Sequence, residues 1–258
     1  METLKENVLG WFKTLHRHPE LGFEEYDTTA LIRRVLTENG VELLPWPLQT
    51  GALAVIRGAK PGPVIAIRAD IDALPVQEES GLPYASEVPG KMHACGHDFH
   101  TAMLLGVAIL LHQRREEIAG TIKLVFQPNE EHAAGAREVD KTGVLSDVSL
   151  LLAGHTYPGQ PAGWLGIREG AVMAAVDSFA VTLRGLSAHA AEPHRSVDPV
   201  PAACELALAL QTIVSRRIGT GGSRPAHHPG FTADPAALYP AAEFFTELAI
   251  QVLIRKTS

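Results

Sequence analysis

Hydrophobic and polar positions along this chain repeat with two different periods, one typical of helices and one typical of buried strands. Near the N-terminus, apolar side chains recur at helical spacing over Leu4–Leu15, and this pattern ends near His18. A second helix is expected to begin at Asp27, a good N-cap residue, and to end at Asn39 before a glycine. A third, more apolar helix is expected over Thr101–Gln113.

Several apolar runs predict strands. The run Val64–Arg68 is continuously apolar, which suits a strand that is buried on both faces. Because strands and helices alternate along the chain, the pattern indicates an α/β fold. The predicted strands are Gly51–Arg57, Val64–Arg68, Thr121–Gln127 and Ser149–His155.

The pattern changes between residues 171 and 217. Ala175–Gly185 resembles a half-exposed strand, and a helix is expected to begin with Asp198 as its cap and Pro199 in its first position. One strand and one helix do not make a stable domain, so we interpret this segment as part of an incomplete unit. A final helix is expected after Asp234.

Composition favours a folded protein and argues against nucleic-acid-binding and membrane-spanning classes. The chain has 258 residues, of which 46% are hydrophobic and 20% charged, so a folded core is expected. The formal net charge of −7 makes a nucleic-acid partner or an anionic membrane surface unexpected. The N-terminus lacks the apolar core of a signal peptide, and no apolar run approaches membrane-spanning length. Two cysteines cannot form a disulfide framework, and a cytoplasmic location is expected.

Metal-ligating residue types gather where the predicted strands end. Cys95 and His97 stand on either side of a glycine in the stretch KMHACGHDFH, and Glu130 and Glu131 are adjacent in NEEH. Asp70 and Asp72, Glu130 and Glu131, and His155 each follow a predicted buried strand. In open α/β sheets, sites form outside the carboxyl ends of the strands, so these side chains can converge although they lie far apart in sequence.

The joint occurrence of these residues suggests a metal centre. Cysteine, histidine and carboxylate side chains bind Zn²⁺, and such mixed sets also hold Mn²⁺, Co²⁺ or Ni²⁺. With the pair His227 and His228, the candidates exceed what one tetrahedral ion needs, which suggests two ions and a shared bridging group. Taken singly, each residue has an ordinary alternative, such as a buried cysteine, a capping histidine or a solvated glutamate pair. The G-x-S-x-G, H-E-x-x-H and P-loop patterns are absent.

Six segments together resemble the N-acyl-amino-acid amidohydrolases, which include hippurate hydrolase, N-acetyldiaminopimelate deacetylase and the indoleacetyl-amino-acid hydrolases. The resemblance implies a zinc-peptidase-like catalytic domain of the α/β class, with a mixed, mostly parallel sheet flanked by helices, and an α+β lid. It spans nearly the whole chain. In chain order the segments are LHRHPELGFEE, IAIRADIDALPVQE, MHACGHDFHTAMLLG, VFQPNEEHAAGA, SAHAAEPHRSVDPV and HHPGFTADPAAL.

The resemblance also implies roles for individual residues. Glu130 matches the general base, which takes a proton from metal-bound water and returns it to the leaving amine. His189 matches a lid histidine that helps to stabilise the oxyanion. Asp72 and Asp98 match residues that orient metal-ligating groups, although turn and helix-cap roles are equally compatible with them. The residues that match ligands of two divalent metal ions are Cys95, His97, Glu131, His155 and His227.

The chain departs from the family pattern in its lid. Residues 1–170 and 218–258 are expected to form a discontinuous catalytic domain, and residues 171–217 to be a remnant of the lid. Against the family pattern, roughly a hundred or more residues are missing between about Ser215 and Ile218, which is far beyond ordinary loop variation. We therefore expect impaired substrate enclosure and no lid-mediated homodimer of the family type.

Three functions are compatible with this sequence. The leading interpretation is metal-dependent hydrolysis of the amide bond of small N-acyl amino acids, impaired by the incomplete lid. The second is a non-catalytic metal-binding remnant. The third is a subunit or binding module whose lid is completed by another chain.

Overall fold

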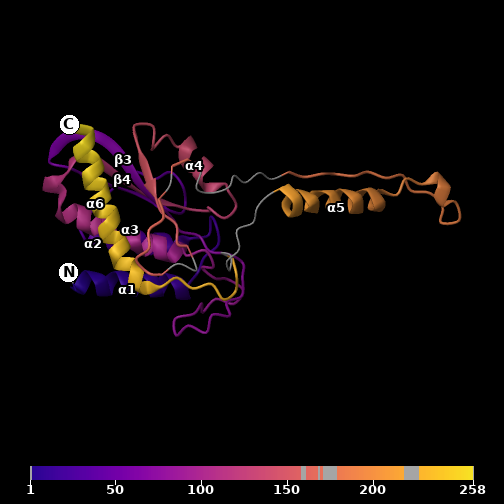
Figure 1. The fold of residues 1–258 in the computed structure, drawn as a ribbon, viewed down its shortest axis with the longest axis horizontal. Helices are drawn as coiled ribbons and strands as arrows, with labels where there is room; N and C mark the ends of the chain where they lie inside the picture. The colour runs from indigo at the N-terminus through magenta and orange to yellow at the C-terminus, as the bar shows by residue number, and fades with distance from the viewer. Residues whose placement is uncertain (1, 158–160, 168, 171–178, 218–226, 258) are drawn as a thin grey trace. The chain divides into compact units, whose positions relative to one another are not determined.

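The computed structural model describes the chain except for residues 1, 158–160, 168, 171–178, 218–226 and 258 (Figure 1). It divides into two compact units. The first unit comprises Met1–Gly166 and Arg224–Ser258, and the second comprises Ile167–Ser223. The assignment of these stretches to a catalytic domain and a lid remnant stays a prediction.

A five-stranded sheet lies at the centre of the first unit, with the strand order β1-β2-β4-β3-β5. β3 pairs in parallel with β4 and β5, whereas β2 is antiparallel to both of its neighbours, so β2 alone runs against the other strands. This mixed sheet, flanked by helices, confirms the predicted fold class. The strands are β1 (Glu42–Leu43), β2 (Ala52–Arg57), β3 (Lys60–Asp70), β4 (Ala119–Gln127) and β5 (Leu151–Ala153).

Both faces of the sheet are covered, as the apolar runs predicted. Successive side chains of a strand point to opposite faces, so Ile65 and Ile67 of β3 join the large core while Ala66 faces a smaller one. The larger core contains residues of α1 (Glu2–Arg17), α2 (Tyr26–Glu38), α3 (His97–Gln113) and α6 (Leu238–Thr257). The smaller core includes Val139 of α4 (Gly135–Lys141).

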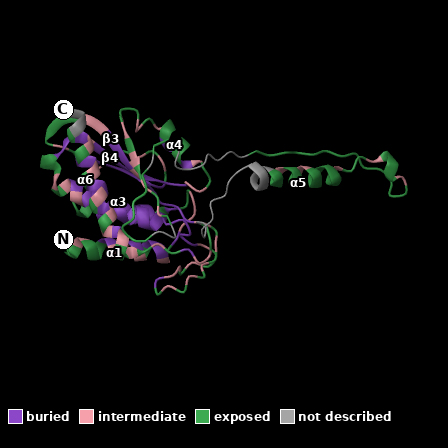
Figure 2. Cartoon of the chain, viewed as in Figure 1, coloured by how far each residue is buried: buried purple, intermediate pink, exposed green. Residues whose placement is uncertain are grey.

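Helix α3 is the central helix of the larger core. Nearly all of its side chains are buried, including Leu104 and Leu105, and it appears almost entirely in the colour of buried residues in Figure 2. It packs against α1, α6 and β3. Because its N-terminal end lies beside the ends of β3 and β4, α3 fixes the position of the first residue of the helix, His97.

Some predicted boundaries are wrong for local reasons. The first two helices agree with the sequence prediction to within a residue or two, but α3 begins at His97 rather than at Thr101. The polar start HDFH does not continue the apolar pattern, so hydrophobic periodicity did not place it in the helix. β1 and α4 were not predicted, since both are short.

The predicted strand Ala175–Gly185 is not observed. Residues 179–185 have no strand assignment, and residues 175–178 lie outside the described part of the chain. A strand needs a partner for its backbone groups, and in the described part of the second unit the one β-bridge joins Leu186 to Val197. The predicted helix α5 (Pro199–Arg217) is confirmed.

One helix is long and apolar enough to meet the criterion for a membrane span, which differs from the expectation that no segment approaches that length. It is the described stretch Pro235–Ile254, which includes most of α6. Core helices of folded proteins meet the same criterion, and Leu238, Ala242 and Leu253 of α6 are buried in the larger core. Of the apolar window in this stretch, 39% is buried inside the first unit.

Candidate metal centre

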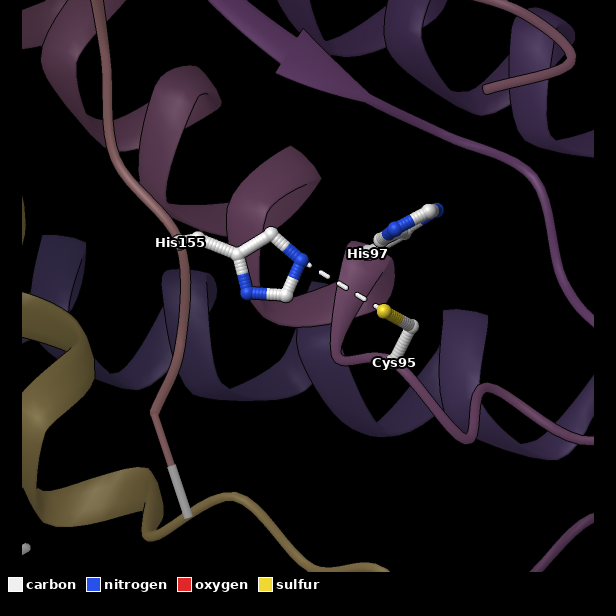
Figure 3. A group of neighbouring side chains, drawn as sticks. All are labelled: Cys95, His97 and His155. Carbon is white, nitrogen blue, oxygen red and sulfur yellow. Dashed lines mark hydrogen bonds between the residues drawn. The ribbon is translucent and has the colours of Figure 1, made fainter. Parts of the chain in front are cut away.

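The ends of β3, β4 and β5 bring the predicted metal-ligating side chains to the N-terminal end of α3. Cys95 Sγ lies 3.4 Å from His155 Nε2, and His97 lies beside both (Figure 3). His97 Nε2 is 3.7 Å from a carboxylate oxygen of Glu131, whose other oxygen is 3.2 Å from His227 Nε2. The five residues therefore form one connected cluster.

His97 is aimed into this cluster by its neighbours. Its Nδ1–H donates to the backbone oxygen of Asp72 at 2.9 Å, and the carboxylate of Asp72 is 3.2 Å from the same nitrogen. Nε2 is thereby left to face the other candidate ligands. Gly96, just before the helix, has φ of 83°, and a Cβ there would lie 2.4 Å from Thr156 Oγ1. A side chain at position 96 would displace the loop that carries Cys95.

Two buried polar atoms in the cluster lack a hydrogen-bond partner among the residues that the structure describes. They are His97 Nε2 and Glu131 Oε1. Leaving a buried polar atom without a hydrogen bond costs free energy, so the burial of these two atoms needs an explanation. A divalent cation supplies one, because a neutral imidazole nitrogen and a carboxylate oxygen both bind metals. The donor set of this cluster thus fits a metal centre.

The charges of the cluster shift several pKa values. Burial lowers the pKa of His97, but the carboxylates of Asp70 and Asp72 outweigh it and hold that pKa well above its ordinary value. Burial raises the pKa of Glu131 to about 7, with Glu130 and Asp72 adding to the rise and His97 opposing it. Groups with these shifts gather at functional sites, and metal binding requires both side chains to release their protons.

A second set of contacts, made by Thr156 and His100, positions His155. These two residues were not predicted from the sequence. Thr156 donates its N–H to His100 Nε2 at 2.9 Å, so the proton of His100 is on Nδ1, which donates to Asp70 at 2.5 Å. The Thr156 hydroxyl donates to the backbone oxygen of Cys95 at 3.1 Å. For His100, the sequence did offer a signal: it stands in the HDFH stretch, one helical turn after Gly96. Thr156 gave no signal, because its partners are distant in sequence.

The remaining predicted residues lie in different places. Glu130 is beside the cluster, with a carboxylate oxygen 3.7 Å from His97 Nε2, and its side chain is 39% exposed. Asp98 contacts no candidate ligand side chain in the described contacts, because its carboxylate accepts from His16 Nδ1 and from the N–H of Phe99. His189 belongs to the second unit, where it is exposed and accepts from the N–H of Ala191, and its role stays a prediction.

His227 rather than its neighbour faces the cluster. Its backbone N–H donates to the oxygen of Ala94 at 2.8 Å, which ties the segment to the Cys95 loop. His228 instead accepts a hydrogen bond from the N–H of Gly230. The C-terminal segment therefore contributes one candidate ligand to a cluster that is otherwise built before residue 160.

The mixed α/β sheet with clustered N, O and S donors at one end fits a metal-binding protein of the α/β class. The profile of Peptidase family M20/M25/M40 matches residues 66–251, and the chain belongs to this family. N-acetylcysteine deacetylase of Bacillus subtilis (strain 168) is 53% identical over 209 residues, covering 81% of this chain and 55% of that protein. N-acyl-L-amino acid amidohydrolase of Geobacillus stearothermophilus is 41% identical over 219 residues, covering 84% of this chain and 59% of that protein. These matches confirm the resemblance found in the sequence.

A solved structure also matches. It is the YXEP protein of Bacillus subtilis, described as a dinuclear metal binding peptidase from the M20 family, with a TM-score of 0.78 and 34% identity. The match covers 98% of this chain and 99% of that one. Against the curated relatives given above, this chain spans a little more than half of their length.

Proposed function

We propose that this chain holds two divalent metal ions and hydrolyses the amide bond of N-acyl amino acids, releasing a carboxylic acid and an amino acid. The observation that carries the proposal is the convergence of five candidate ligands, with the carboxylate of Glu130 3.7 Å from His97 Nε2. The names of two relatives, N-acetylcysteine deacetylase and N-acyl-L-amino acid amidohydrolase, support the substrate class.

The proposed ligands are Cys95, His97, Glu131, His155 and His227. Bound ions would supply Lewis-acid chemistry, polarising the scissile carbonyl and acidifying a water. Asp72 keeps the metal-facing nitrogen of His97 in place, as a carboxylate behind a ligating histidine commonly does.

Glu130 is proposed to move the proton. Its carboxylate is more exposed than that of Glu131, which is 5% exposed, so a water and a substrate can reach it. It would take a proton from the attacking water and give it to the leaving nitrogen, which departs as the amine of the free amino acid. By its match to the family's lid histidine, His189 is proposed to help stabilise the oxyanion of the tetrahedral intermediate.

The test is a hydrolysis panel on purified protein. N-acetyl and N-benzoyl amino acids are offered with Mn²⁺ or Zn²⁺, and released amino acid is measured together with metal content. We expect turnover in the native chain and a loss of about 10³-fold or more in Glu130→Gln, with two ions still bound.

The matched control is Glu138→Gln, because Glu138 lies on α4, outside the cluster, and pairs with Lys141. It is expected to retain the native rate. Two bound ions without turnover would contradict the hydrolase and favour a metal-binding protein. Turnover that arises only with a stoichiometric second chain would favour a subunit whose lid is completed in trans.

A further inference from the structure

The loop that carries Glu130 and Glu131 is folded into a conformation that its own residues do not favour. Asn129 has φ of 49° and Ala133 has φ of 52°, both in the left-handed region. Asparagine tolerates this region better than alanine, but each residue costs free energy there. A Cβ on Gly135 would lie 1.6 Å from the backbone oxygen of Pro128, so the loop closes tightly on itself. Such a loop persists only if contacts from outside hold it.

One outside contact comes from Glu25, which lies 104 residues earlier in the chain. Its Oε1 accepts the backbone N–H of Asn129 at 2.8 Å, and its side chain is fully buried. Burial raises the pKa of Glu25, and the hydrogen bond from the backbone N–H of Asn129 opposes the rise. A buried carboxyl group at this position is costly unless it has a definite partner, and its partner here is the loop.

Glu25 is not simply a helix cap. It occupies the N-cap position of α2, but its side chain makes no cap hydrogen bond there. The first N–H groups of α2 are bound instead by Glu20, whose carboxylate accepts from Asp27 and Thr28 at 3.0 and 2.8 Å. Glu20 accepts the hydrogen bonds of the first N–H groups of α2, so the carboxylate of Glu25 is left to bind Asn129.

The same N-terminal segment also makes room for the loop. A Cβ on Gly22 would lie 2.0 Å from Asn129 Oδ1, so only glycine leaves space for this carboxamide. That oxygen accepts a hydrogen bond from His132 Nδ1 at 2.9 Å, which fastens the far side of the loop.

On the other side of Glu130, the backbone N–H of Glu131 donates to Asp72 at 3.0 Å. The two N–H groups that flank Glu130 are therefore each held by a buried carboxylate, one from the N-terminal segment and one from the end of β3. We propose that Glu25 is a positioning residue for Glu130 and Glu131 and acts through the N–H of Asn129. The effect of Glu25 on catalysis rests on the proposed hydrolase function, whereas the effect of Glu25 on the conformation of the loop does not.

The experiment compares Glu25→Met, which removes the acceptor at similar volume, with Glu25→Gln, which keeps an oxygen acceptor. The first measurement is hydrogen exchange at the Asn129 amide in metal-free protein. We expect Glu25→Met to speed this exchange at least about 10-fold and Glu25→Gln to stay within about 3-fold of the native chain.

The second measurement is the kinetics of the metal-loaded protein. A misplaced base lowers kcat, so Glu25→Met is expected to lose about 10- to 100-fold in kcat with KM within about 3-fold, and Glu25→Gln to restore most of it. Glu24→Met is the matched control, because Glu24 is the adjacent residue and its side chain is 61% exposed. It is expected to behave as the native chain in both measurements.

Native exchange at Asn129 in a folded Glu25→Met chain would overturn the proposal, as would equal losses of kcat in the Met and Gln variants. If Glu25→Met fails to fold, Glu25→Asp takes its place, because it keeps the charge but shortens the reach by one methylene. Faster exchange is again expected, and unchanged exchange overturns the proposal. If the native chain hydrolyses no substrate, the proposed function fails while the exchange measurement still decides the role of Glu25.

Discussion

At the scale of single residues, His16 shows how a buried charge connects three segments of the chain. Its Nδ1–H donates to Asp98 at 2.6 Å and its Nε2–H donates to Glu78 at 3.1 Å. Burial lowers the pKa of His16, but the hydrogen bonds and charges of Asp98 and Glu78 outweigh it and raise that pKa to about 9. His16 is thus protonated at neutral pH and joins α1 to the start of α3.

This pKa predicts a pH dependence of stability. Because the folded pKa of about 9 exceeds the unfolded value of 6.5, the stabilisation is complete below pH 6.5 and is lost as the pH rises through 9. The free energy of unfolding should fall by on the order of 2 to 3 kcal/mol across this window relative to His16→Gln. Urea unfolding of the metal-free native and His16→Gln chains at several pH values measures this change. If the free energy of unfolding depends on pH in the same way in both chains, the raised pKa of His16 is contradicted.

A second prediction at this scale concerns His100, which holds the backbone of Thr156 next to His155. Substituting His100→Asn should lower Zn²⁺ affinity by about 10- to 100-fold, as the loss of residues behind metal ligands commonly does. Competition with a chromophoric chelator measures the affinity. His112→Asn, at the other end of α3, serves as control, and equal affinity in all three chains would refute the role of His100.

The sequence predicted the residue types of the centre but not the contacts that orient them. Cys95 and His97 stand in a short motif, and Glu130 and Glu131 follow a predicted strand, so chemistry and topology indicated them together. Glu25 and Thr156 bind partners that are distant in sequence, and neither residue type is unusual in a loop. Only the folded backbone shows that their hydrogen bonds reach the centre.

At the scale of elements, α6 completes the larger core from the C-terminal segment. Leu253 is fully buried, and the helix packs against α3, β3 and β4. Leu253→Ala should lower the free energy of unfolding by about 2 to 5 kcal/mol, because a cavity forms where the side chain was. Chemical denaturation measures the change, and the exposed neighbour substitution Gln251→Ala should stay within about 0.5 kcal/mol of the native chain. A similar loss in both variants would argue against the packing described for α6.

Apolar runs predicted the central strands well because both faces of the sheet are covered. Val64–Arg68 falls within β3 and Thr121–Gln127 within β4, since each must bury its side chains on both sides. Ala175–Gly185 has a similar local preference, but its described part has no strand partner. Local pattern thus predicts a strand only where the rest of the fold supplies a neighbour.

At the scale of the whole molecule, the metal ions should stabilise the first unit by mass action. A ligand present at about 1,000 times its dissociation constant adds about 4 kcal/mol to the free energy of unfolding. All three tryptophans, Trp11, Trp46 and Trp164, belong to this unit, so tryptophan fluorescence reports on its unfolding.

Treatment with a chelator is therefore expected to lower the Tm seen by fluorescence, and added Zn²⁺ or Mn²⁺ should restore it. The double substitution of Cys95→Ser and His227→Asn should remove the restoration, because it takes away two proposed ligands. A Tm that does not respond to chelator or metal would speak against a centre in this unit.

The candidate metal ligands are synthesised at different times because they lie far apart in the sequence. Cys95, His97, Glu131 and His155 are synthesised first, and His227 arrives only after the whole second unit has been made. A nascent chain thus carries an incomplete set of the proposed donors during the synthesis of that unit. Metal loading under the proposed function therefore belongs after translation, when the last histidine closes the set.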